Sequence, residues 1–132
     1  LLMNVGPTAR GTWDHRALNA LDTYGDWMAL HSDAIYGCTQ SEFDPPQDCR
    51  LTQNGNKLYI HIFAWPFKHL YLNRLAGKVS YAQFLHDGSE IDLSGIPEWQ
   101  RHSKPDETAL VLTLPVKKPE VIVPVVELTL KL

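Results

Sequence analysis

The chain has 132 residues, a mass of 15.0 kDa and a formal net charge of -3 at pH 7, with 44% hydrophobic and 20% charged residues. This length favours one domain, and it excludes a complete (β/α)8 barrel, which needs about 200 residues or more, and a two-domain dinucleotide-binding enzyme. The composition is globular, and 12 basic against 15 acidic residues give no basic field, so we expect neither nucleic acid nor a membrane as a partner.

The first predicted elements are a strand and a helix. Residues 1–5 form a short apolar run that a Gly-Pro pair ends, as in a buried strand. From Trp13 to about His31 apolar residues recur every three or four positions, which predicts an amphipathic helix with Asp14 as its N-cap. Because the chain opens inside a strand that has no partner nearby, we expect its N-terminus to be cut from something larger.

The rest of the chain predicts β-structure. Residues 38–49 contain a Pro-Pro pair that excludes a helix, and we interpret them as a linker. Asn54-Gly55-Asn56 is typical of a hairpin turn, and Pro124 predicts an edge strand or a bulge. Strands are expected at residues 50–53, 57–65, 69–72, 79–84, 89–93, 109–114 and 121–130. Short strands with turn signals between them are typical of an antiparallel β-sandwich.

Few residue patterns indicate chemistry. Cys38 and Cys49 could close one loop or stay reduced, and their spacing fits neither a zinc site nor a redox motif. The six histidines show no metal-ligand spacing, and the carboxylates lie at helix ends and in turns, where acidic residues are ordinary. We therefore expect no metal and no cofactor, and we interpret the histidines as structural or surface residues.

Aromatic side chains on one predicted strand are candidates for sugar contact. Tyr59, Phe63 and Trp65 fall on the same face of the strand expected over residues 57–65, and aromatic rings stack on sugar rings. The alternative is that this face packs on a neighbouring layer, such as Tyr24 and Trp27 of the helix.

Several segments resemble the family 29 α-L-fucosidases. LLMNVGP at residues 1–7 is similar to the family's LLLNVGP segment, and LDTYGDWM at 21–28 with AIYG at 34–37 resembles its L…IGxWL…EAIYG pattern. TQNGN at 52–56 continues the likeness, which covers roughly residues 1–85.

The resemblance implies a particular place for this chain in a longer enzyme. In that family a (β/α)8-like catalytic domain precedes a C-terminal β-sandwich. Residues 1–37 would then hold the last barrel strand, 1–5, and the last barrel helix, 15–31. Residues 38–49 would be the linker and 50–132 the sandwich. The implied fold class is mainly β, an antiparallel β-sandwich preceded by one strand-helix unit left over from the barrel.

The family hydrolyses terminal α-L-fucosides with retention, through an Asp nucleophile and a Glu acid/base. These residues and the fucose-binding histidines come from barrel segments that have no match here, so no catalytic residue is assigned. Asn4 is the one residue expected near the cleft, because barrel active sites form at the C-terminal ends of strands. The resemblance implies a fucosylated glycan as substrate of the parent enzyme, and many bacterial relatives are secreted or periplasmic.

Four roles are compatible with the sequence. The leading hypothesis is a C-terminal fragment of an α-L-fucosidase that acts as scaffold and as one wall of the cleft. Residues 1–36 would contact the missing barrel or a second copy, because the apolar helix face needs cover. The alternatives are a stand-alone carbohydrate-binding module using Tyr59, Phe63 or Trp65, an association module, and a small glycosidase with new carboxylates.

Overall fold

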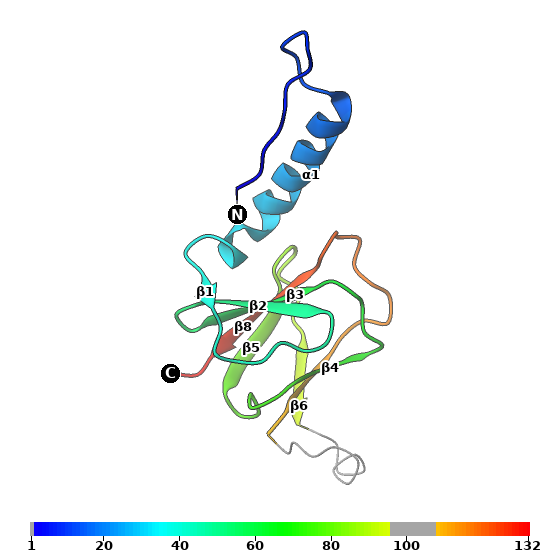
Figure 1. Ribbon diagram of the computed structural model, residues 1–132. Helices are drawn as coiled ribbons and strands as arrows, with labels where there is room; N and C mark the ends of the chain where they lie inside the picture. The colour runs from blue at the N-terminus through cyan, green and yellow to red at the C-terminus, as the bar shows by residue number, and fades with distance from the viewer. Residues whose placement is uncertain (1, 96–107) are drawn as a thin grey trace.

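A computed structural model describes residues 2–95 and 108–132. Within these residues lie α1 (His15–His31), the short 3-10 helix η1 (Ser32–Ala34) and the strands β1 (Thr39–Gln40), β2 (Cys49–Asn54), β3 (Lys57–Ile62), β4 (His69–Leu72), β5 (Val79–Phe84), β6 (Asp92–Gly95), β7 (Leu110–Thr113) and β8 (Val125–Leu130). Figure 1 shows α1 standing off the strands, with residues 2–12 running back along it. The molecule therefore has a β-rich body and a helical extension.

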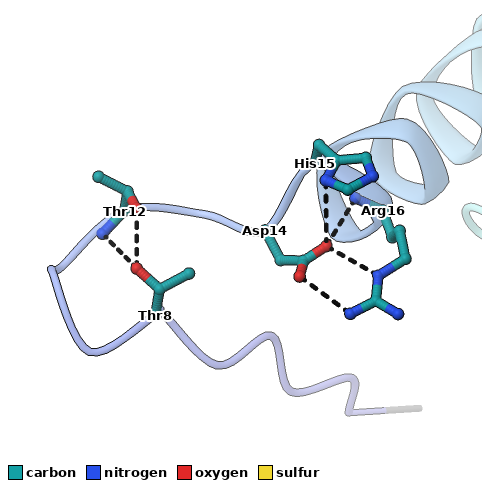
Figure 2. A network of polar contacts seen from close by, with 5 residues as sticks. All are labelled: Thr8, Thr12, Asp14, His15 and Arg16. Atoms are coloured by element: carbon teal, nitrogen blue, oxygen red, sulfur yellow. Dashed lines mark hydrogen bonds and ion pairs between the residues drawn. The ribbon is translucent and has the colours of Figure 1, made fainter.

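Helix α1 begins where the sequence predicts. The Asp14 carboxylate accepts a hydrogen bond from the Arg16 backbone N–H at 2.8 Å, which satisfies one free amide of the first turn. The Arg16 guanidinium also bonds this carboxylate, and these contacts lower the pKa of Asp14 (Figure 2). Just before the cap, the Thr12 backbone N–H donates to Thr8 Oγ1 at 3.2 Å and stabilises the turn. The predicted helix, cap and end near His31 are confirmed.

The strand expected over residues 1–5 is not formed in the part of it that the structure describes. Residues 2–7 have neither helical nor strand structure, and Leu2 and Met3 are exposed. A strand needs hydrogen-bonding neighbours, and the described residues place none beside this segment. Among the described residues, the apolar run is therefore neither buried nor part of a strand.

The strands form two antiparallel sheets. The larger has the order β1-β2-β3-β8-β5 and the smaller the order β4-β7-β6. Because β8 lies between β3 and β5, the expectation that Pro124 marks an edge strand or a bulge is wrong. Pro124 directly precedes β8, where a missing N–H costs no ladder bond, and its carbonyl accepts from the Ile62 N–H at 3.0 Å.

One hydrophobic core joins the two sheets. It contains Leu58, Ile60, Val126 and Leu128 from the larger sheet and Leu70, Leu72, Leu110 and Leu112 from the smaller one. On β3 the side chains alternate, since Ile60 and Ile62 enter this core while Tyr59 belongs to a second cluster on the other face, with Ala34 and Val125. The predicted mainly-β fold, an antiparallel sandwich with one helix ahead of it, is confirmed.

Several boundaries differ from the expected ones. The segment 38–49, expected as a linker, contributes β1 and the buried Phe43 and Cys49, so it is part of the fold. Strand β3 ends at Ile62 instead of residue 65, whereas the hairpin turn at Gly55, φ 57°, follows the prediction. Cys38 and Cys49 are free thiols that pack in different clusters, one on each side of the larger sheet.

Candidate functional site

The helical extension carries a large exposed apolar surface. Of the 17 residues of α1, only His31 is fully buried, so the apolar stripe that the sequence predicts has little to pack on in this chain. We define the helical surface by its exposed side chains, which are Met3, Leu18, Leu21, Tyr24 and Leu30. Met3, Leu21 and Tyr24 of this set line one groove, and exposed apolar side chains gathered in this way are typical of an interaction site.

Asn4 lies in a groove on this surface. The groove has a volume of about 300 Å³ and is lined by residues 3–6 and by Ala17, Ala20, Leu21 and Tyr24 of α1. Asn4 itself is exposed, and no acidic residue lines the groove with it. The arrangement suits the docking of apolar side chains better than it suits acid–base chemistry.

The three candidate aromatics do not form one platform. Tyr59 is buried, and burial next to Glu127 raises the pKa of its hydroxyl. Trp65 packs on the main core, 6.2 Å from Phe84 between ring centroids, and its Nε1 donates to the Pro115 carbonyl at 3.1 Å. The shared face predicted for them is therefore wrong, because β3 ends at Ile62 and the alternation that would align them stops there.

Phe63 is the one exposed side chain of the three, with 62% of its surface accessible. It borders a shallow hollow of about 370 Å³ together with Asp48 and Arg50. The Phe63 N–H donates to the Asp48 carbonyl at 2.9 Å, which fixes the base of the hollow. An aromatic ring beside a carboxylate and a guanidinium can offer both stacking and hydrogen bonds to a polar ligand.

A cluster that the sequence did not reveal lies where α1 meets the larger sheet. The ring of Trp27 stacks on His31 at 4.5 Å between centroids and lies 6.3 Å from the ring of His61 on β3. His86, after β5, lies 6.4 Å from His31. Trp27 also donates from Nε1 to the Val123 carbonyl at 3.1 Å. We call His31, His61 and His86 together with Trp27 the histidine junction.

Hydrogen bonds fix the protonation of two of these rings. His31 Nδ1 lies 2.8 Å from the Trp27 carbonyl, which only accepts, so Nδ1 carries a proton. Thr52 Oγ1 donates to the Ala34 carbonyl at 2.6 Å and therefore accepts from His61 Nε2 at 2.9 Å. Each ring is thus held as a donor by a backbone or hydroxyl oxygen, with no carboxylate involved.

Burial favours the neutral form of both rings. It lowers the pKa of His31, and the neighbouring His86 lowers it further. The pKa of His61 is lowered by its own burial and by His31. Only two signals in the sequence pointed to this arrangement: His31 stands four positions after Trp27, and His61 stands two positions after Tyr59, on the same face of β3.

Comparison with known proteins relates the whole chain to one enzyme family. No protein-family model and no curated protein matches the chain. Among solved structures, alpha-L-fucosidase isoenzyme 1 from Paenibacillus thiaminolyticus matches 98% of this chain with 37% sequence identity and a TM-score of 0.86. The chain corresponds to the C-terminal portion of a family 29 α-L-fucosidase. The resemblance carried by LLMNVGP and AIYG is therefore confirmed.

Two more distant fucosidases share the fold. A GH29 alpha-L-fucosidase from Bacteroides thetaiotaomicron, trapped as a covalent intermediate, is 22% identical over 98% of this chain with a TM-score of 0.80. The Thermotoga maritima alpha-fucosidase, in complex with a mechanism-based inhibitor, is 22% identical over 98% of the chain with a TM-score of 0.74. In all three comparisons the chain spans only 28–30% of the fucosidase's own length.

Two further properties of this fucosidase portion concern ligands and membranes. Within residues 2–95 and 108–132, no three or more His, Cys, Asp or Glu side chains are grouped so as to hold a metal ion. Among the same residues, no helix combines the length and the apolar character that crossing a membrane requires.

Proposed function

We propose that this chain is the scaffold portion of an α-L-fucosidase, supporting the catalytic portion and forming one wall of its substrate cleft. The observation that carries the proposal is the exposed helical surface. The match to the Paenibacillus enzyme covers 98% of this chain but only 30% of that enzyme. Removing each large apolar side chain of this surface from water would contribute about 1.5–3 kcal/mol at full burial, which favours a permanent partner.

The proposed arrangement follows the family. Residues 1–37 would supply the last strand and helix of the catalytic barrel, 38–49 the connection, and 50–132 the sandwich domain. The open edges of residues 2–5 would then find partner strands, and Leu21 would face the barrel. Asn4 would stand at the C-terminal end of its strand, where it would position substrate without reacting.

The parent enzyme would hydrolyse terminal α-L-fucosyl groups of glycans, whereas this chain alone would not. Glu127 is the one buried carboxylate in the described residues, and Lys57 donates to it at 3.3 Å. Retaining hydrolysis needs two carboxylates across the sugar. We therefore expect homogeneous chain to show no turnover of an aryl α-L-fucoside. Robust turnover that one Asp or Glu substitution in this chain abolishes would contradict the proposal.

A chimera tests the scaffold role directly. The chain would replace the matching segment of the Paenibacillus thiaminolyticus enzyme, and hydrolysis of 4-nitrophenyl α-L-fucoside would be measured. We expect a folded, active chimera in which Leu21→Asp lowers the yield of active enzyme by about tenfold or more, because a buried unpaired charge is costly.

The matched control is Asn19→Asp, which adds the same charge to the polar side of α1. We expect this variant to leave the yield of active enzyme within about twofold of the parent chimera. Equal yields from the two variants would show that the helical surface contacts no other part of the enzyme. Light scattering on the isolated chain separates the alternative of self-association, since that role requires dimers that Leu21→Asp dissociates.

A second candidate role is glycan contact at Phe63. It is favoured by the exposed ring beside Asp48 and Arg50, whereas Tyr59 and Trp65 are engaged in packing. Calorimetry with fucosylated oligosaccharides would detect binding that Phe63→Ala removes. The control is Phe67→Ala, an exposed ring elsewhere on the same loop, which should leave that binding unchanged. Binding unaffected by Phe63→Ala would exclude this role.

A further inference from the structure

The histidine junction is the principal attachment of α1 to the β-rich body. The turns of α1 that precede its last two are largely exposed. Near its end, Trp27 contacts Val123 and His61, and His31 contacts His86. Just after the helix, the Ala34 carbonyl accepts from Thr52 of β2 at 2.6 Å. The placement of the whole helical surface relative to the sandwich therefore depends on a few side chains.

Two ring nitrogens in the junction are buried without a hydrogen-bond partner in the described structure. They are Nε2 of His31 and Nδ1 of His86. The neutral His31 ring presents a lone pair at Nε2, since Nδ1 donates to the Trp27 carbonyl. A proton added at Nε2 would create a charged donor with no acceptor, in a residue whose accessible surface is 0%.

The charges around these rings do not offset such a proton. His31 faces His61 from β3 and His86 from the turn after β5, so its nearest titratable neighbours are histidines, which supply no negative charge. Asp87 lies 3.5 Å from His86 Nε2, on the solvent side, and is the one acid ion-paired to the cluster among the described residues. Asp26 and Glu120 line a surface groove with His31 but form no ion pair with it, and Asp33 and Glu127 act on Tyr59.

We propose that the histidine junction is an acid-sensitive attachment, which holds α1 on the sandwich at neutral pH and releases it when His31 and His61 are protonated. Above the ordinary histidine pKa of 6.5 the His31 and His61 rings are neutral whether α1 is attached or free, so the attachment is complete. As the pH falls below that value, the free rings bind protons more readily than the attached ones. Acid therefore shifts the equilibrium toward release.

The inference concerns this chain alone and does not depend on the proposed function. Its consequence is conformational: the helical surface, fixed at neutral pH, becomes free to move relative to the two sheets. The main core between the two sheets is not expected to open, because His61 lies on the face of β3 opposite Ile60 and Ile62, which enter that core.

Amide hydrogen exchange of the 132-residue chain at pH 7.5 and 5.5 tests the proposal. After correction for intrinsic exchange rates, we expect protection at residues 27–35 to fall by at least about threefold on acidification, with no change in β3 and β8. Resonances of the His31 and His61 rings, followed by NMR, should titrate below the ordinary histidine range. Unchanged protection at residues 27–35 would overturn the proposal.

Variants assign the effect to the cluster. His31→Phe keeps a ring against Trp27 but cannot be protonated. His61→Gln keeps a hydrogen-bond donor for Thr52 and also cannot be protonated. Each variant should reduce the pH dependence of exchange protection at residues 27–35 by about half or more. His15→Gln and His69→Gln, at exposed positions, should leave it unchanged. If His31→Phe does not fold, the His61→Gln variant and the pH titration of the wild-type chain still test the proposal. An undiminished pH dependence in folded His61→Gln would contradict the proposal.

Discussion

The β-rich body and the helical extension solve the problem of apolar surface in opposite ways. In the body, both sheets bury their apolar faces on each other, and Leu58, Leu112 and Leu128 are completely inaccessible. In the extension, an amphipathic helix leaves Leu18 and Leu21 partly exposed to solvent. The comparison teaches that a well-formed element need not have its packing partner in the same chain.

The largest difference between the two regions should appear on truncating a leucine. Leu128→Ala on the central strand β8 is expected to lower the free energy of unfolding by about 2–5 kcal/mol, because it leaves a cavity in the core. Leu18→Ala on α1 should change it by less than about 0.5 kcal/mol. Urea unfolding of the two variants measures both values, and equal losses would mean that α1 packs on protein in this chain after all.

An intermediate effect is expected at the place where the regions meet. Trp27→Ala removes the ring that stacks on His31 and its hydrogen bond to Val123. Because Trp27 is only half-buried, the loss should be roughly 1–3 kcal/mol, below that of a core tryptophan. Trp13→Ala, an exposed residue just ahead of the helix, is the matched control and should have little effect on unfolding followed by circular dichroism. Similar values for both tryptophans would argue against an attachment at Trp27.

The smallest effect concerns the two thiols and appears only in alkali. Burial raises the pKa of Cys49 to about 11 from its ordinary 9.0, with a further contribution from Asp48. The unfolded thiol ionises first, so stability is unaffected below about pH 9 and falls as the pH rises above that value. Alkylation by iodoacetamide at pH 8 should modify half-buried Cys38 before Cys49, and both after unfolding. Rapid native modification of Cys49 would show that the core opens readily.

Much of the fold was predictable because it depends on neighbours in sequence. The spacing of apolar residues and the Asp14 cap define α1, and the turn at Gly55 together with alternation defines β2 and β3. β4 and β5 have the predicted limits. The family resemblance also rested on local segments, LLMNVGP and AIYG, and comparison with solved structures confirmed it.

The candidate site was much less predictable, because burial depends on residues distant in sequence. The alternation of side chains along a strand predicted that Trp65 and Tyr59 share one face. The strand ends at Ile62, however, and the two rings pack in different hydrophobic clusters. Asn4 was expected on a strand, and it lies instead in a groove against α1.

The sequence by itself determined α1, the turn at Gly55 and the places of most strands, since periodicity and turn chemistry act over a few residues. Only the tertiary structure decided that β8 is central, that residues 2–5 lack partner strands among the described residues, and that His31 meets His61 and His86. These arrangements depend on contacts between segments that are distant in sequence, and the stability of such contacts cannot be predicted from a local sequence pattern.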